Sequence, residues 1–304
     1  MPLSPIFPES RRIAIFSDIH GNRQALGAIL KDMQARGIKD IACNGDLITS
    51  SAHSAEVVKK IRELGIPSTR GNHERYLFEL SDPADEKWQL DNWAATRHEY
   101  KVLDTRDKSW LYDLPESLCL QEEKIPLFMT HGAPGDDRAR LTSQTSEQSW
   151  QSIFASFPQN TTLIGSHLHR FWRYEGMHGQ FVRTPSAGLP LDGDTSAAYC
   201  VLERQTNGWT VELCRVAYDL DKELADFKKS DFYQEGGVFT HLLWLELKTA
   251  RWWVMPFFAH LATVFADSQE GRKGYSHEEM RFAWQSFDRN LYPDYDPDKS
   301  DVLV

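Results

Sequence analysis

A chain of 304 residues is long enough for one large or two modest domains, and its 41% apolar and 26% charged residues are typical of a globular protein. The formal net charge of −10 argues against a broad nucleic-acid-binding face, because that affinity comes mostly from Lys and Arg that neutralise phosphates. A small anionic substrate is not excluded, because divalent cations make a site locally positive.

The N-terminal segment 1–11 has three prolines in its first ten residues and no apolar run typical of a secretory signal, which favours a cytoplasmic protein. The four cysteines are widely spaced, form no CxxC pair and mostly lie within apolar runs, so we expect buried, reduced thiols: Cys43, Cys119, Cys200 and Cys214. Cys43 lies three residues before Asp46, but a thiol inside a strand favours a core position over a metal ligand.

The apolar run 13–16 predicts a buried strand that ends just before Asp18 and His20. Successive apolar residues suit a strand that is covered on both faces of a parallel sheet, and such strands present functional groups beyond their carboxyl ends. In extended backbone, residues i and i+2 point to the same side, so we expect Asp18 and His20 to face one cation. The alternative is a surface turn in which Asn22 caps the next helix.

The same pattern recurs four times further along the chain. Strand-like runs at 40–43, 67–70, 125–130 and 161–166 are each followed by polar side chains: Asp46, then Asn72 and His73, then His131, then His167 and His169. This mixed set of nitrogen and oxygen donors suits Mn, Fe or Zn, and its size is sufficient for two ions that share a carboxylate.

Between these runs the sequence alternates strand and helix. Amphipathic patterns predict helices from Asn22 to Gly37 and over 55–64, as in a doubly covered parallel sheet. The segment 75–114 is expected to be mostly helical, and a further helix is expected over 146–157 with Trp150, Ile153 and Phe154 facing inward.

Three later strands are expected at 180–184, 197–203 and 209–216, the last two joined by a hairpin turn at Asn207-Gly208. We expect all three to complete a second sheet. From residue 219 the pattern is helical again and contains no further ligand motif.

The segment 238–265 is unusually aromatic, yet Glu246, Lys248 and Arg251 divide it into pieces shorter than a membrane span of about 20 residues. Its apolar residues instead repeat in steps of four and three, which predicts one packed helical stripe: Leu243, Leu247, Ala250, Val254, Phe257, Leu261 and Val264. Pro256 is expected to kink or split this helix, because proline removes a backbone donor and clashes with the carbonyl of Trp252.

Three tryptophans of this segment have alternative placements. Trp244, Trp252 and Trp253 could cover the preceding domain, meet a second subunit in a homo-oligomer formed through 238–265, or lie on a membrane surface. The two histidines His241 and His260 are expected to be packed or exposed, without a bound metal. The acidic tail after Tyr292 is expected to be a loose end.

Taken together, the motifs resemble those of the calcineurin-like metallophosphoesterase superfamily. All five occur in the superfamily's order: Asp18-x-His20, Gly45-Asp46, Gly71-Asn72-His73-Glu74, His131-Gly132 and His167-x-His169. The resemblance spans about residues 12–215, because the loop 184–190 also resembles the one that follows the last ligand in the small bacterial phosphodiesterase-like branch.

This resemblance implies an α/β fold, the four-layer α/β/β/α sandwich, with a catalytic domain over 12–217 and a helical, aromatic-rich extension over 218–304. It also implies a ligand set. One metal would be held by Asp18, His20 and His169, the other by Asn72, His131 and His167, and Asp46 would bridge both. His73 would face the leaving group.

The chain departs from the superfamily pattern in two motifs. Ser166 lies between the glycine and the first histidine of the last motif, and Glu74 stands where many members have Asp. The Gly45-Asp46 motif lacks the downstream Asp-Arg-Gly of the protein Ser/Thr phosphatases, whose Asp orients the catalytic His and whose Arg holds phosphate. A protein phosphatase is therefore disfavoured.

Four residues are candidate substrate contacts. Arg75 and Tyr76 follow His73 and could contact the substrate, although both also suit a packed helix face. Arg138 and Arg140 follow His131, and either could fork onto a phosphate oxygen or belong to a solvated loop of balanced charge.

The implied chemistry is hydrolysis of a phosphoester by a hydroxide held between two divalent metals. Because no arginine clamp is identified, diesters are favoured over monoesters, and nucleotide-type phosphodiesters are the first expectation. The alternatives are a phosphomonoesterase or protein Ser/Thr phosphatase-like enzyme, and a non-catalytic scaffold of the same fold.

Overall fold

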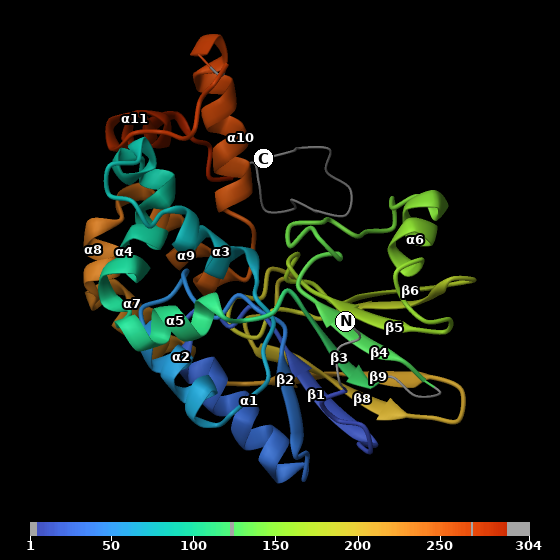
Figure 1. Cartoon of the computed structure of the whole chain (residues 1–304). Helices are drawn as coiled ribbons and strands as arrows, with labels where there is room; N and C mark the ends of the chain where they lie inside the picture. The colour runs from blue at the N-terminus through green and yellow to red at the C-terminus, as the bar shows by residue number, and fades with distance from the viewer. Residues whose placement is uncertain (1–4, 122–124, 269, 291–304) are drawn as a thin grey trace.

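The computed structural model describes residues 5–121, 125–268 and 270–290, and its strands form two mixed sheets (Figure 1). The first sheet has the order β2 (Asp40–Cys43), β1 (Arg12–Phe16), β8 (Ala197–Arg204) and β9 (Trp209–Val216). The second has the order β3 (Ser117–Gln121), β4 (Leu127–Thr130), β5 (Thr162–Gly165), β7 (Gly179–Arg183) and β6 (Trp172–Gly176).

The helices fall into three groups along the chain. The first group belongs to the sandwich: α1 (Arg23–Ala35), α2 (Ser54–Glu63) and α6 (Glu147–Phe154). The second lies in the insertion between β2 and β3: α3 (Asn72–Glu79), the 3₁₀ turns η1 (Glu86–Gln89) and η2 (Asp91–Trp93), α4 (Ala94–Val102) and α5 (Thr105–Tyr112). The third follows β9: α7 (Leu220–Lys229), α8 (Asp231–Glu235), α9 (Gly237–Thr249), α10 (Val254–Val264), the 3₁₀ turn η3 (Ala266–Ser268) and α11 (His277–Ser286).

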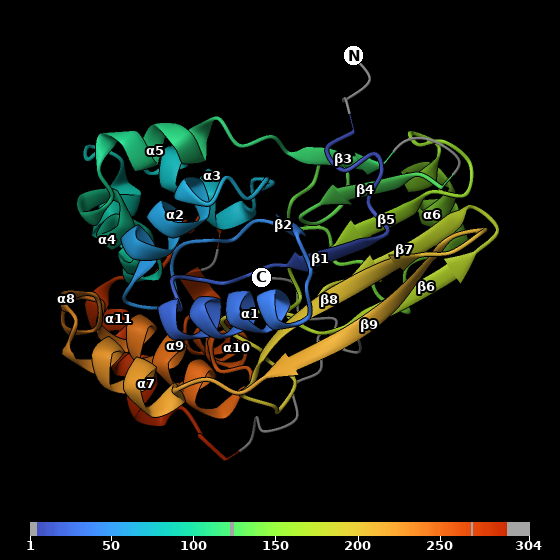
Figure 2. The same ribbon diagram turned by 90° about the horizontal axis from the view of Figure 1, so that it is seen from below.

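Strand β1 shows why the sandwich has four layers. Its side chains alternate between two apolar clusters, as the period of two in a strand requires. Ile13 and Ile15 belong to the core between the two sheets, whereas Ala14 and Phe16 pack toward α1 and α2. Figure 2 shows α1 lying along the outer face of this sheet.

Helix α6 covers the outer face of the second sheet. Trp150 and Phe154 of α6 are buried against Leu163 and Phe181 of that sheet, as the inward face of the expected helix predicts. The order of layers is therefore helix, sheet, sheet, helix. This confirms the α/β/β/α fold class with a helical C-terminal region.

The expected membership of the second sheet is wrong for two strands. Only β7 joins it, whereas β8 and β9 extend the first sheet, where β8 runs antiparallel to β1. Between β7 and β8 the chain crosses from one sheet to the other, and β8 then places Cys200 and Leu202 in the core between the sheets. An alternating pattern identifies a strand but not the neighbour with which it pairs.

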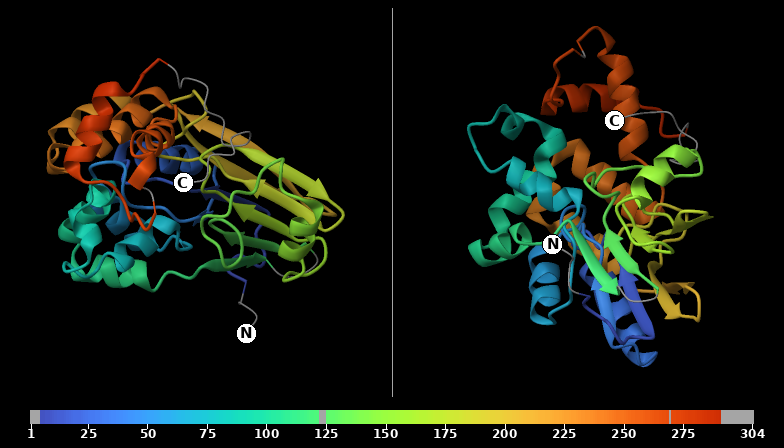
Figure 3. Two further views of the ribbon diagram at one scale, coloured as in Figure 1. Left: turned by 90° about the horizontal axis from the view of Figure 1, so that it is seen from above. Right: turned by 45° about the vertical axis from the view of Figure 1, so that its right-hand side comes forward.

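The helices of the insertion and those of the C-terminal region lie together on one side of the sandwich, as Figures 1 and 3 show. Helix α4 packs against α8 and α9, and α9 also contacts η2. The segment 75–114 is mostly helical, as expected. Within the described residues no helix has both the length and the apolar character needed to cross a membrane.

The helix expected over 238–265 is split, but Pro256 does not cause the split. Helix α9 ends at Thr249, where Ala250 adopts a left-handed conformation with φ of 51°, and α10 begins at Val254. Pro256 therefore lies in the first turn of α10, where a helix has no acceptor for its amide and proline is tolerated. The predicted stripe is divided between two apolar clusters, one on each side of the break.

The remaining expectations for the core agree with the structure. All four cysteines are buried and free. Trp244 and Trp252 pack in a cluster that includes Leu189 and Leu191, which is the first of the three placements considered, whereas Trp253 packs in a cluster formed only by the C-terminal helices. His241 packs against Trp244, and Nε2 of His260 lies 3.2 Å from the carbonyl of Ala283. The acidic tail lies outside the described residues.

Candidate metal centre

Loops at the carboxyl ends of parallel strands bring the motif residues together. Strands β1 and β2 are parallel neighbours, and so are β4 and β5, so their following loops meet at the same edge of the sandwich. The nominated ligands follow these four strands, except Asn72, which is the first residue of α3.

Left-handed backbone is concentrated in these loops. Among the described non-glycine residues, nine have positive φ, and seven of them lie in or next to the motifs: Asp18, His20, Asp46, Thr49, Ser50, His167 and His169. Such conformations cost free energy and persist only where the surrounding contacts enforce them, which is common at functional sites. Asp18 and His20 therefore come together through tight turns, and the extended backbone expected for them is wrong.

Gly71 shows how closely the loops approach one another. A Cβ atom at this position would lie 2.2 Å from Oδ1 of Asp46, so only glycine fits. The same approach allows the amide of His73 to donate to Oδ1 of Asp46 at 2.9 Å.

The first cluster consists of Asp18, His20 and His169, all buried. Oδ1 of Asp18 lies 3.3 Å from Nε2 of His169, and the Nε2 atoms of the two histidines are 3.2 Å apart. Both oxygens of Asp18 are buried and have no hydrogen-bond partner among the described residues. A buried carboxylate without a partner is costly, so this cluster fits a cation.

The second nitrogen of each histidine supports this fit. Nδ1 of His20 faces the carbonyl of Ile48 at 2.9 Å, and Nδ1 of His169 faces the carbonyl of Leu189 at 2.7 Å. A carbonyl only accepts hydrogen bonds, so Nδ1 carries the proton in each ring. When both rings are neutral, as metal ligands are, the two Nε2 atoms present lone pairs to each other, an arrangement that a metal ion satisfies.

The second cluster contains Asp46, His131 and His167. Oδ2 of Asp46 lies 3.1 Å from Nε2 of His131 and 3.9 Å from Nε2 of His20, so this carboxylate lies between the two clusters. Nδ1 of His131 faces the carbonyl of Asn44 at 2.7 Å. Oδ1 of Asn72 lies 3.0 Å from Nδ1 of His167.

The charged side chains of the centre shift one another's pKa values. Burial opposes ionisation of Asp46, but His131, His73 and His20 together outweigh it and hold the pKa of this carboxyl well below its usual range. Burial also opposes protonation of His131, yet the charge of Asp46 raises the pKa of this imidazole to about 10. Burial lowers the pKa of His20 and that of His167 to about 3, so both rings are neutral and available as ligands at neutral pH.

Comparison with known proteins agrees with this geometry. The sequence model of the calcineurin-like phosphoesterase family matches residues 11–183. This chain belongs to the calcineurin-like phosphoesterase family. The match confirms the resemblance inferred from the five motifs. The family consists of hydrolases that act on phosphoesters and use divalent metal ions, and the two clusters of this phosphoesterase are suited to such ions.

Relatives of this phosphoesterase occur in archaea and bacteria. The chain is 28% identical over 233 residues to an uncharacterized protein of Methanocaldococcus jannaschii, a match that covers 69% of this chain and 89% of the relative. Its fold is similar to that of a metallophosphoesterase from Sphaerobacter thermophilus, with 21% identity, a TM-score of 0.63, and coverage of 80% of this chain and 100% of the other. A hypothetical protein from Pyrococcus horikoshii is 19% identical with a TM-score of 0.58, covering 74% and 98%.

His73 lies beside the first cluster. Its ring centroid is 4.9 Å from that of His20, and it shares a third possible metal group with His20 and Asp46. Asn72 and His73 are the first two residues of helix α3. Adjacent helical residues are about 100° apart around the axis, so the two side chains diverge.

Sequence reasoning missed the partner of His73. The hydroxyl of Thr49 donates to the carbonyl of Ile48 and lies 2.5 Å from Nδ1 of His73, from which it accepts. Thr49 has a φ of 66°, which is unusual for a β-branched residue, and its amide donates to Glu99. The only signal in the sequence was its place three residues after Asp46.

Two buried carboxylates hold the loops of Asp46 and Thr49 in place by accepting hydrogen bonds from their backbone amides. Glu74 accepts from the amides of Asp46, Leu47 and Gly71, so the acid noted as a departure from the superfamily pattern supports the bridging residue. From helix α4, Glu99 accepts from Thr49 and from the hydroxyl of Ser54. Burial raises the pKa of Glu74 and that of Glu99 to about 7.

The four candidate substrate contacts lie on two segments, Arg75 and Tyr76 on α3 and Arg138 and Arg140 in the loop after His131. Arg75 makes a bidentate pair with Asp137, with bonds of 2.7 and 2.8 Å, and therefore ties α3 to the loop that carries Arg138. Its guanidinium also covers the ring of Tyr76 at 4.9 Å. Contact of Arg75, Tyr76, Arg138 or Arg140 with substrate stays a prediction.

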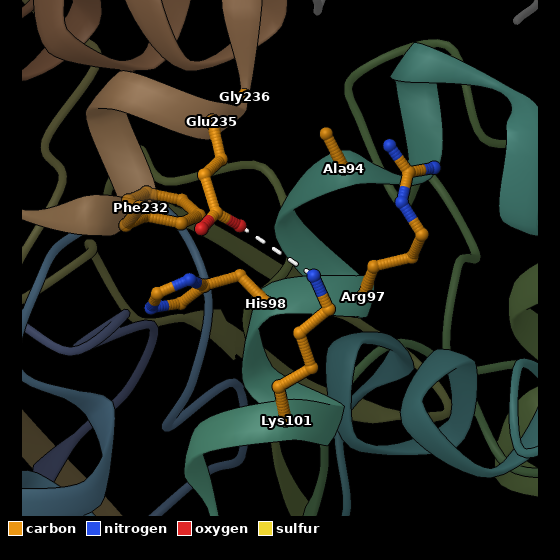
Figure 4. A pocket seen from close by; sticks show the side chains of 7 residues that line it. All are labelled: Ala94, Arg97, His98, Lys101, Phe232, Glu235 and Gly236. Carbon is orange, nitrogen blue, oxygen red and sulfur yellow. Dashed lines mark hydrogen bonds and ion pairs between the residues drawn. The ribbon is translucent and has the colours of Figure 1, made fainter.

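A separate cavity of about 130 Å³ lies between α4 and α8, away from the nominated ligands (Figure 4). Its lining includes Arg97, His98 and Phe232, and Lys101 pairs with Glu235 at 3.5 Å. This cavity therefore lies where the insertion contacts the C-terminal helices.

Proposed function

We propose that this protein is a phosphodiesterase whose centre holds two divalent metal ions, of Mn, Fe or Zn. The observation that carries the proposal is the convergence of buried histidine nitrogens and carboxylate oxygens, including both oxygens of Asp18, which have no hydrogen-bond partner among the described residues. This mixed donor set suits those three metals.

The distances support a division into two sites. Asp18, His20 and His169 would hold one ion, and His131, His167 and Asn72 the other. Asp46 would bridge them, because its Oδ2 lies within 4 Å of a histidine from each set. When bound, the metals would supply an activated hydroxide and neutralise charge on the phosphate oxygens.

The protein's own groups have separate tasks in this proposal. Backbone carbonyls orient the ligand rings, and Glu74 fixes the loop of Asp46. His73 is held by Thr49 beside the centre, where the doubly protonated ring would give its Nε2 proton to the departing oxygen and keep its Nδ1 proton in the hydrogen bond to Thr49. Diesters are favoured because Arg75, the arginine nearest to His73 in sequence, is engaged by Asp137 and so is not poised as a clamp for a phosphomonoester.

The test combines elemental analysis with a substrate screen. The purified protein is assayed for bound metals, loaded with Mn, and given a chromogenic phosphodiester, a phosphomonoester and cyclic nucleotides. We expect two metal ions per chain and faster hydrolysis of diesters. Preference for the monoester would overturn the diester assignment, and a protein without metal or turnover would indicate a scaffold.

A further inference from the structure

A continuous row of rings crosses the metal centre. Each neighbouring pair has ring centroids 4.9 to 6.2 Å apart, and the row runs in this order: Trp93, Tyr76, His73, His20, His169 and Trp252. The three inner members belong to the motifs. The outer members come from the insertion at one end of the row and from the C-terminal region at the other end.

Trp252 is held at its end of the row by the break between α9 and α10. Left-handed Ala250 turns the chain, and its carbonyl accepts from the amide of Gly193 at 2.9 Å. On the far side of the break, Glu246 accepts from the amides of Trp253 and Val254, both at 2.9 Å. The backbone on both sides of Trp252 is thus fixed.

The adjacent tryptophan has a different environment. Trp253 donates to Thr249 and packs in the cluster formed by α10 and α11, whereas Trp252 packs beside Leu189 and Leu191 and reaches His169. Only one of the two neighbouring indoles therefore meets the metal centre.

The opposite end of the row is built by the insertion. Tyr76 of α3 lies edge-on to both His73 and Trp93, with centroid distances of 5.6 and 5.5 Å. Trp93 in turn lies under the ammonium of Lys87 at 5.0 Å. Tyr76, Trp93 and Trp252 are all half-buried, so none of the three residues is wholly enclosed in a core.

We propose that Trp252 on one side and Tyr76 with Trp93 on the other bind the two organic arms of a phosphodiester, and that at least one arm is a nucleobase. The proposal rests on the proposed function, which places the phosphate between these rings. Flat bases stack on aromatic side chains and gain about 1–3 kcal/mol per base. Two aromatic flanks suit a phosphate with two arms, whereas a monoester occupies one flank only.

The decisive experiment keeps the leaving group constant and changes the other arm. Hydrolysis of thymidine 5′-(p-nitrophenyl phosphate) is compared with that of methyl p-nitrophenyl phosphate by the Mn-loaded full chain. For Trp252→Ala we expect the KM of the thymidine ester to rise about tenfold or more, with its kcat and the methyl ester unchanged. Trp252→Phe, which keeps a ring, should restore most of the loss.

A binding measurement tests the same contact without turnover. Calorimetric titration with thymidine 5′-monophosphate, whose single base occupies one flank, should show weaker binding by Trp252→Ala or by Tyr76→Leu than by wild type. Phe282→Ala removes an exposed ring of α11 outside the row and serves as the control, for which we expect no change.

The outcomes separate this inference from the proposed function. Equal losses on both esters, or unchanged binding of the nucleotide by both variants, would overturn stacking while leaving the phosphodiesterase assignment intact. If neither ester is hydrolysed by wild type, the proposed function fails, and the titration alone then decides whether the rings bind a nucleotide.

Discussion

Asp46 is the residue on which both clusters depend. Its carboxylate lies between His20 and His131, and its pKa is far below its usual range, so it is charged at any working pH. We predict that Asp46→Asn abolishes hydrolysis more completely than His20→Ala, because one substitution weakens both metal sites. Elemental analysis should show reduced occupancy of at least one metal. Full metal content with full turnover would refute the bridging role.

His73 is predicted to act on the leaving group and not as a ligand. Replacing a proton donor typically costs 10²–10⁴-fold for a poor alkoxide leaving group, whereas nitrophenolate leaves readily. We therefore expect His73→Ala to slow alkyl phosphoesters far more than nitrophenyl ones while metal content stays constant. Since His73 also lies within reach of His20 and Asp46, a lost metal ion would identify it as a ligand. Equal losses on both substrates would indicate substrate positioning.

Thr49 is predicted to orient the ring of His73 through its hydroxyl. Thr49→Val keeps the branched shape in the same left-handed backbone and removes only the hydrogen bond. Loss of such a bond costs about 0.5–1.5 kcal/mol, so we expect a roughly 2- to 10-fold lower kcat on alkyl esters.

Two controls define this prediction. Thr49→Ser retains the hydroxyl and should behave like wild type, and Thr49→Val should add nothing in the His73→Ala background, because both act through one ring. If Thr49→Val slows nitrophenyl and alkyl esters equally, the hydroxyl of Thr49 does not act through His73.

At the scale of elements, the junction between α9 and α10 depends on one buried carboxyl. Burial raises the pKa of Glu246 to about 7 from 4.5 in the unfolded chain. Between these values the unfolded chain releases its proton first, so the contribution of Glu246 to the free energy of unfolding is fully present below pH 4.5 and is lost as the pH rises through 7. The shift corresponds to a contribution on the order of 3 kcal/mol.

Glu246→Gln tests this junction. The glutamine oxygen can still accept from Trp253 and Val254, but the side chain never ionises. We expect the variant to have a higher melting temperature than wild type above pH 7, and the difference to disappear below pH 4.5. A difference that does not vary with pH would show that ionisation of Glu246 does not limit stability.

At the scale of the whole molecule, the apolar clusters indicate which parts fold together. The core between the sheets, and the one between the first sheet and its helices, use no residue after Tyr218. The cluster around α10 and α11 lies wholly after that point. A third cluster joins the two regions, because Leu189 and Leu191 pack against Phe227 and Leu247.

We predict that truncation after Tyr218 leaves a folded fragment that still binds metal but is less soluble. The sandwich keeps its own cores, whereas the fragment exposes Leu189 and Leu191 and loses Glu223, which accepts from Ser51 and from the amide of Gln24. Thermal unfolding, elemental analysis and size-exclusion chromatography provide the measurements. Loss of cooperative unfolding would mean that the C-terminal helices belong to one indivisible core.

The sequence by itself determined the strands that carry the motifs and the identity of the family. An apolar run that ends at Asp18 or at His167 is a local pattern, and the carboxyl ends of parallel strands gather their loops at one edge, so the candidate ligands could be named from sequence. The amphipathic helices α1 and α6 followed from the same local periodicity.

Only the tertiary structure decided which strands pair across the sheets, where the C-terminal helix breaks, and what surrounds the metal centre. The break depends on left-handed Ala250 and on Glu246, and the pairing of β8 with β1 joins segments far apart in the chain. The contacts of Thr49 with His73 and of Trp252 with His169 likewise join separate segments of the chain. Sequence periodicity specifies which face of an element is apolar, whereas the choice of the opposing element is made by packing among distant segments.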